Sequence, residues 1–173
     1  MKRAAIVLPF ALALLLPLAA GPSARGQDAA AAWRTFEGSW SASGHRESLP
    51  TEGSRVASSS YLSGALVLTV TDASLNKGFR WEAIGFDDGV KVSVVRCVWT
   101  DQRGDRIFST LTGEVMADGR RFAGTITGGT GRYAGIEGDY AFKWQFVVEA
   151  EKGSIQGRAV NLKGRYRAKG GGQ

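Results

Sequence analysis

Residues 140–149 read YAFKWQFVVE, and this stretch decides the fold class. Apolar side chains occupy every second position: Tyr140, Phe142, Trp144, Phe146 and Val148. Successive side chains of an extended strand point to opposite faces. The aromatic set therefore lies on one face, and we expect that face to cover an apolar interior. The stretch predicts a β-strand with one buried side.

Segments of the same kind recur along the chain. Short runs rich in Val, Ile, Thr and aromatic residues are separated by breaks that contain Gly, Asp or Asn, which is typical of an all-β protein. The predicted strands cover residues 34–45, 55–71, 78–87, 90–101, 105–116, 120–128, 138–150 and 154–167.

The breaks between these strands predict how the strands connect. Turn-forming Gly or Asp occurs in Asn76–Gly78, Asp87–Gly89, Gln102–Asp105, Ala117–Gly119 and Glu151–Gly153. Connections this short join antiparallel neighbours. Eight strands in this order predict an all-β, eight-stranded antiparallel up-and-down barrel, because closure removes exposed sheet edges. A two-sheet β-sandwich is the alternative.

The N-terminal segment has the features of a secretory signal. Residues 1–3 carry two basic side chains, residues 4–20 are uncharged and rich in Leu and Ala, and Ala24-Arg25-Gly26 places small residues at the two positions that a signal peptidase reads. The apolar run is shorter than a usual membrane span and contains two prolines, so we expect cleavage and no stable membrane insertion. Residues 1–26 are therefore predicted to be a signal peptide, and the mature protein is predicted to be secreted or periplasmic.

The rest of the chain has the length of one domain. Residues 27–33 are expected to form a flexible leader, residues 34–168 a single β-barrel domain, and residues 169–173 a flexible Gly-rich tail. Loss of the signal removes three basic residues, which lowers the formal charge from +6 to about +3. The remaining charges are interspersed without a basic run, so a nucleic-acid partner is not expected.

The sequence contains few residues suited to metal or thiol chemistry. Cys97 is the only cysteine and lies in an apolar run, so a buried, inert thiol is favoured over a reactive one. His45 is the only histidine, which leaves no His or Cys partners for a zinc or copper site. Neither a metal nor an organic cofactor is predicted.

A glycine-rich segment at residues 124–138 reads GTITGGTGRYAGIEG. It resembles the Gly-Gly-Thr-Gly-(Arg/Lys)-(Tyr/Phe)-Ala-Gly segment of allene oxide cyclase-like and dirigent-like barrels. The resemblance implies an eight-stranded antiparallel barrel that, in members with known activity, steers cyclisation or radical coupling of hydrophobic small molecules, usually without a cofactor. Such barrels often form trimers, so it also leaves a homo-oligomer open. Physically, the glycines permit positive φ and close backbone approach at a barrel corner, with Tyr133 folding back over the barrel end.

A second, shorter motif is Gly38-Ser39-Trp40, near the start of the first predicted strand. It resembles the Gly-x-Trp motif of lipocalins and other calycins, whose Trp closes one end of the barrel beneath a basic residue from the last strand. That resemblance implies that Arg165 or Arg167 lies over Trp40.

Three charged residues within predicted strands are candidates for catalysis. Glu82, Arg96 and Glu114 belong to the third, fourth and fifth predicted strands. If their faces turn inward, two carboxylates and a guanidinium lie together inside the barrel, and a carboxylate there could act as a general base with a raised pKa. The alternative is an outward ladder of ion pairs, because a shift of one residue in register reverses the face.

Aromatic residues are expected to line the barrel interior. The predicted ligand-binding residues are Trp81, Phe108, Tyr140, Phe142, Trp144 and Phe146. An eight-stranded barrel is either filled by its side chains or holds one small ligand. Binding of a small hydrophobic molecule is the leading hypothesis for function. A cyclase or isomerase, and a structural or oligomeric interaction protein, are the alternatives.

Overall fold

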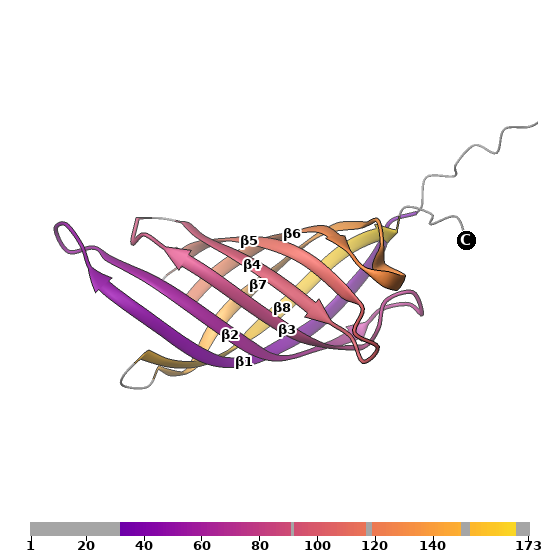
Figure 1. The fold of residues 1–173 in the computed structure, drawn as a ribbon, viewed down its shortest axis with the longest axis horizontal. Coiled ribbons are helices and arrows are strands. Elements are labelled where there is room, and N and C mark those ends of the chain that lie inside the picture. Colours follow the sequence, from indigo (N-terminus) through magenta and orange to yellow (C-terminus); the bar gives the residue numbers. More distant parts are fainter. Residues whose placement is uncertain (1–31, 91, 117–118, 150–152, 169–173) are drawn as a thin grey trace, which may run out of the picture.

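The fold is a closed barrel of eight antiparallel strands, seen in a computed structural model that describes residues 32–90, 92–116, 119–149 and 153–168 (Figure 1). The strands are β1 Arg34–Pro50, β2 Val56–Val70, β3 Gly78–Asp87, β4 Val92–Thr100, β5 Arg106–Met116, β6 Gly119–Gly129, β7 Ile136–Glu149 and β8 Ser154–Ala168. Each strand pairs with the next, and β8 pairs with β1. The predicted up-and-down barrel is confirmed, and the sandwich alternative is wrong.

The strands begin and end close to the predicted positions, with the largest difference in β1. This strand continues to Pro50 because residues 46–50 pair with the start of β2, from Arg46 opposite Ser60 to Pro50 opposite Val56. These residues are mostly polar, so they carry no alternating apolar pattern that a sequence reading could use. The predicted turn residues 117–118 and 151–152, the signal peptide, leader residues 27–31 and the tail lie outside the described residues.

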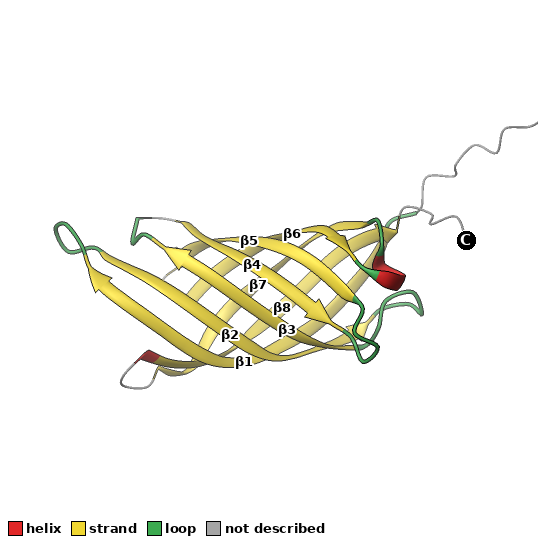
Figure 2. Cartoon of the chain, viewed as in Figure 1, coloured by secondary structure: helices red, strands yellow, loops and turns green. Residues whose placement is uncertain are grey.

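The barrel has two distinct ends because consecutive strands run in opposite directions. The C-terminal ends of β1, β3, β5 and β7 meet at one end, on the left in Figure 1. The C-terminal ends of the other strands meet on the right, together with the 3-10 turn η1, Gly131–Tyr133, which Figure 2 shows in red. We call these the open end and the closed end, for reasons given below.

The glycine-rich corner between β6 and β7 plugs the closed end. Tyr133 is 1% exposed, and its hydroxyl donates a hydrogen bond of 3.0 Å to Asp101. Its ring packs near Phe79, with ring centroids 5.8 Å apart. Gly131 has φ 53°, and a Cβ there would lie 1.8 Å from the Asp105 carboxylate. The predicted return of Tyr133 over the barrel end is confirmed, and Gly131 makes it possible.

A second network at the closed end joins the β2–β3 loop to the last strand. Tyr166 donates to the Asp72 carboxylate at 2.7 Å, and the Ser74 backbone N–H donates to it at 2.8 Å. Arg34 forms an ion pair with Asp72 at 3.0 Å. The hydrogen bond from the Ser74 hydroxyl is the largest cause that lowers the pKa of Asp72, which falls from 3.8 to about 2. The folded protein therefore favours ionised Asp72.

The Asp72 network predicts how stability responds to acid. The unfolded chain binds the proton more tightly, so lowering the pH from about 4 to about 2 should remove roughly 1 kcal/mol of stability, after allowance for the exposure of this side chain. Asp72→Asn should remove that part of the acid dependence, and Ser74→Ala should reduce it. Urea unfolding at several pH values would measure both, with Ser41→Ala on the outer face as the matched control. Equal acid dependence in wild type and Asp72→Asn would contradict the prediction.

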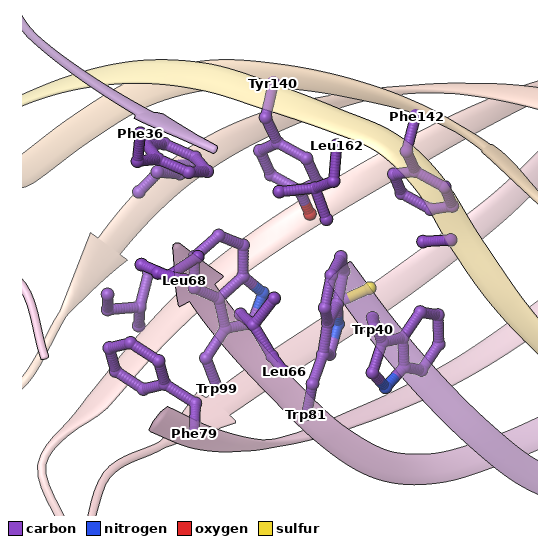
Figure 3. Packing of buried hydrophobic residues seen from close by; sticks show 14 of the residues in the cluster. Phe36, Trp40, Leu66, Leu68, Phe79, Trp81, Trp99, Tyr140, Phe142 and Leu162 are labelled. Carbon is purple, nitrogen blue, oxygen red and sulfur yellow. The ribbon is translucent and has the colours of Figure 1, made fainter. Parts of the chain in front are cut away.

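Aromatic side chains fill the middle of the barrel and the closed end. Figure 3 shows Phe36, Trp99, Trp81 and Trp40 in succession along the interior. The Trp40 and Trp81 rings stack with centroids 4.3 Å apart, and Trp81 and Trp99 are 5.0 Å apart. Glycine makes room for some of these rings: a Cβ at Gly124 would lie 2.3 Å from the Tyr140 ring. This part of the interior is packed, as in an ordinary protein core.

Candidate functional site

The open end contains a pocket of about 80 Å³ inside the barrel. A single water molecule needs about 10–15 Å³ of such space, so several heavy atoms of a narrow ligand fit. The wall is mainly apolar, and its apolar members are Trp40, Leu62, Ala83, Phe86, Val95, Leu111, Phe122, Phe142, Trp144, Phe146 and Ile155. The pocket therefore suits an apolar chain or small ring.

The sizes of the inward side chains explain why the pocket lies at this end. Along β2 they change from Leu66 in the packed core to Ser60 and Ser58 near the open end. Along β3, the large Trp81 is followed on the same face by Ala83 and Gly85. Two neighbouring strands thus contribute smaller residues toward the open end, and space remains that the core aromatics do not reach.

Charged side chains border the apolar wall at the mouth. Arg120 forms an ion pair with Asp87, and their side chains are 27% and 13% exposed. The Arg46 guanidinium lies 5.9 Å from the centre of the Phe146 ring. Arg46, Asp87 and Arg120 all line the same pocket as Trp40 and Trp144. The mouth therefore combines two guanidinium groups with one carboxylate, next to an apolar interior.

Five of the six predicted ligand-binding residues lie on or near the interior face. Trp81, Tyr140, Phe142 and Trp144 are buried, and Phe142 and Trp144 line the pocket. Phe146 also lines it and is 37% exposed at the mouth. Trp81 and Tyr140 lie deeper, in the packed part. Trp81 and Tyr140 therefore belong to the packed core and do not line the pocket.

Phe108 does not face the interior, so the prediction that it lines the inside of the barrel is wrong. Its neighbours Ile107 and Ser109 are buried, at 0% and 1% exposure. Phe108 pairs with Val98 on the other face of the sheet. The inward positions of β5 include Ile107, Ser109 and Leu111, one residue out of step with the predicted set. This strand has apolar residues on both faces, so its sequence shows no alternation from which the inward face could be predicted.

Glu82, Arg96 and Glu114 do not form an interior cluster, because all three side chains lie on the outer face. Glu82 accepts a hydrogen bond of 2.8 Å from Tyr61 and pairs with Arg80 at 3.1 Å, on the outer surface. Arg96 and Glu114 are exposed. The inward positions at this level belong to buried residues such as Ala83 and Cys97, where an ion would lose its water shell.

The sequence reading missed the charged mouth of the pocket. Arg46 was predicted beyond the end of its strand, and Asp87 and Arg120 at strand ends beside turns. In the folded barrel, Arg46 lies on the same inward face of its strand as Trp40, and Asp87 on the same inward face as Trp81. Arg120 pairs across the sheet with the inward Trp144. A charged residue at an even spacing from an inward aromatic of the same strand is the signal that could have identified them: six residues after it for Arg46 and Asp87, and two before it for Arg120.

A small polar cluster lies in the packed interior. Ser109 and Tyr140 share a hydrogen bond of 2.7 Å, and burial raises the pKa of the Tyr140 hydroxyl well above its ordinary value. Cys97 is 2% exposed, and burial raises the pKa of its thiol to about 12. The prediction that Cys97 is buried is therefore confirmed. A thiol with this pKa contains almost no thiolate, the reactive form, at neutral pH.

Cys97 should accordingly resist alkylation in the folded protein. Iodoacetamide at neutral pH is expected to leave the native protein unmodified and to modify it fully in denaturant, because unfolding exposes the thiol and returns its pKa to the ordinary range. Intact-mass spectrometry reads both results. Rapid alkylation of the native protein would show that the thiol is accessible.

The Gly-x-Trp motif has a different environment from the one that its resemblance implied. Trp40 packs in the core, and neither Arg165 nor Arg167 lies over it. Both guanidinium groups instead lie 4.7 Å from the ring of Trp33, and they pair with Asp139 and Glu137. The basic residues of the last strand thus hold the start of the domain against the outer surface.

The described part of the chain brings no three His, Cys, Asp or Glu side chains together as candidate metal ligands. Within the same residues, no helix has the length and apolar character needed to cross a membrane. Three buried indole N–H groups, those of Trp40, Trp81 and Trp99, have no hydrogen-bond partner among the described residues.

Comparison of the chain with protein-family models, with curated proteins and with solved structures found no match in any of the three. The functional argument therefore rests on the barrel and its pocket.

Proposed function

We propose that this protein is an exported, cofactor-free barrel that binds a small hydrophobic molecule in the open-end pocket. The observation that carries the proposal is a mainly apolar pocket of about 80 Å³ inside a barrel whose other end is plugged. Apolar walls with a few polar groups are typical of small-molecule sites. Export rests on the signal-like residues 1–26, and N-terminal sequencing of the protein recovered from its host tests it.

Binding of 1-octanol to the mature protein tests the proposed pocket. Trp40 and Trp144 line the pocket, so an apolar chain that enters should change tryptophan emission in a saturable manner. Native mass spectrometry of protein from its host, with solvent extraction, would identify a ligand that co-purifies. A protein that carries no ligand and binds no apolar probe would exclude the proposal.

A role in self-association is the second candidate, and an exposed apolar patch favours it. Ile84, Phe86 and Val94 are 62%, 59% and 50% exposed on the outer face of β3 and β4, and Phe86 pairs directly with Val94. Exposed apolar residues that adjoin one another are candidates for protein contact. Sedimentation at micromolar concentration should show an oligomer that Phe86→Asp dissociates, and a wild-type monomer would exclude this role.

The cyclase or isomerase alternative has weaker support. It rests on the resemblance of residues 124–138, and that segment serves here to plug the closed end. The carboxylates of Glu82 and Glu114 lie outside the barrel, away from the pocket. Substitution of either by Gln should therefore leave binding in the pocket unchanged.

A further inference from the structure

Exposed apolar side chains gather at the open end of the barrel. They belong to six strands and to the β3–β4 turn, and we call them the apolar rim: Leu49, Val56, Phe86, Val90, Val94, Met116, Phe146, Val147 and Val148. Their exposed fractions range from 37% to 67%. Among the large exposed apolar residues in the described part of the chain, only Trp33 and Val67 lie toward the closed end. The two ends of the barrel therefore present different surfaces to a partner.

The apolar rim is continuous with the pocket. Phe86 pairs directly with Val94 across β3 and β4. The β3–β4 turn adjoins the β1–β2 hairpin, because a Cβ at Gly89 would lie 2.7 Å from the carbonyl oxygen of Val56. Phe86 and Phe146 also line the pocket. Apolar surface thus extends from the pocket wall over its mouth, and a large exposed apolar area of this kind is typical of an interaction site.

One part of the rim projects beyond the rest of the barrel. Within the described residues, β8 pairs with β1 as far as His45, and β3 pairs with β2 from Ser58. Residues 46–57 therefore form a two-stranded ribbon, which extends furthest to the left in Figure 1. Leu49 near its tip is 67% exposed. A two-stranded ribbon is marginally stable in water by itself, so a contact at its tip would stabilise it.

We propose that the open end docks on a lipid surface, with the apolar rim at the boundary between head groups and acyl chains. Apolar side chains at the end of a folded domain bind such a boundary because contact with lipid removes them from water. The mouth of the pocket then faces the lipid.

Two observations favour a lipid surface over a protein partner. The rim lies around the mouth of the pocket, so a protein seated on it would cover the entrance, whereas a lipid surface is a source of small hydrophobic molecules. This step rests on the proposed function, because it assumes that the pocket takes such molecules. The rim is also uneven, since the ribbon of residues 46–57 projects from it, and a fluid surface accommodates a projection without a matching hollow.

Flotation with phosphatidylcholine vesicles tests the docking. The experiment uses the mature protein, residues 27–173, so that the apolar signal segment does not contribute. We expect the protein to float with the vesicles and to remain bound at high salt, because the lipid has no net charge and the proposed contact is apolar.

Two valines of the same strand provide matched variants. Val56 and Val67 both belong to β2 and are 47% and 49% exposed, but Val56 lies on the rim and Val67 lies toward the closed end. Val56→Asp should weaken vesicle binding by about tenfold or more, and Val67→Asp should leave it unchanged. Leu49→Asp at the tip of the ribbon should act like Val56→Asp. Neither Leu49 nor Val56 lines the pocket, so both variants should bind 1-octanol as the wild type does.

The outcomes separate docking from binding in the pocket. A wild-type protein that binds 1-octanol but not the vesicles would overturn the docking alone, and one that binds neither would overturn both proposals. Equal loss of vesicle binding in Val56→Asp and Val67→Asp, or full binding by both rim variants, would also overturn the docking. A dimer that Val56→Asp dissociates, in a protein that ignores vesicles, would assign the rim to a second copy of the chain. Circular dichroism and thermal unfolding show whether each variant is folded.

Discussion

Trp81→Ala is expected to lower the free energy of unfolding by roughly 3–5 kcal/mol, the usual cost of truncating a fully buried Trp. Trp81 is 0% exposed, and its ring meets Trp40, Trp99, Tyr140 and Phe142 at centroid distances of 4.3 to 5.8 Å. The closed sheet holds the strands at fixed separations, so the surrounding rings cannot collapse fully into the cavity. Urea denaturation followed by circular dichroism measures the change.

Trp33→Ala is the matched control for this loss. Trp33 is 44% exposed on the outer surface, against Arg165 and Arg167, so its removal should cost about 1 kcal/mol or less. A comparable cost for the two substitutions would show that the aromatic core does not govern stability. A cost for Trp81→Ala below about 1 kcal/mol would indicate an interior more plastic than a packed core.

Ala83→Leu should weaken binding of 1-octanol by about tenfold or more. Ala83 is 4% exposed and lines the pocket, so three additional carbons occupy space that the ligand chain would use. Some strain is expected, since enlarging a buried side chain costs roughly 1–3 kcal/mol. The tryptophan emission titration described above measures the affinity, and thermal unfolding shows whether the variant is folded.

Ala141→Leu makes the same chemical change on the outer face of β7, where residue 141 is exposed. It should leave binding unchanged. Full-strength binding by a folded Ala83→Leu variant would mean that the probe binds elsewhere, for example on the exposed outer face at Ile84 and Val94. Loss of binding in both variants would point to a general effect on the barrel.

The pattern of β7 and the turns were sufficient to predict the barrel. Tyr140, Phe142 and Trp144 alternate with polar or small residues, and only one orientation of the strand buries them. The turn residues allowed only antiparallel neighbours. Burial of the Cys97 thiol and the return of Tyr133 over one end also followed from local sequence.

The orientation of β4 and β5 did not follow in the same way. In β4, apolar Val94 and Val98 lie on the outer face, while Cys97 and Trp99 lie inside. Alternation cannot show which face of a strand points inward when both faces are apolar. A register shift of one residue then exchanges two faces that look alike in the sequence. The inward prediction for Phe108 failed for this reason, and the same ambiguity left the face of Arg96 open.

The sequence by itself determined an all-β chain of eight antiparallel strands, since alternation and turn chemistry act over a few neighbouring residues. Only the tertiary structure decided what the interior contains. Closure of β8 onto β1 sets the large rings of several strands against one another, and it leaves a space at the end where Ala83 and Ser60 face inward. It also gathers Arg46, Asp87 and Arg120 at one mouth from three strands. The volume of the pocket and the charges around it depend on side chains from strands that are distant in sequence, so they cannot be predicted from any single segment.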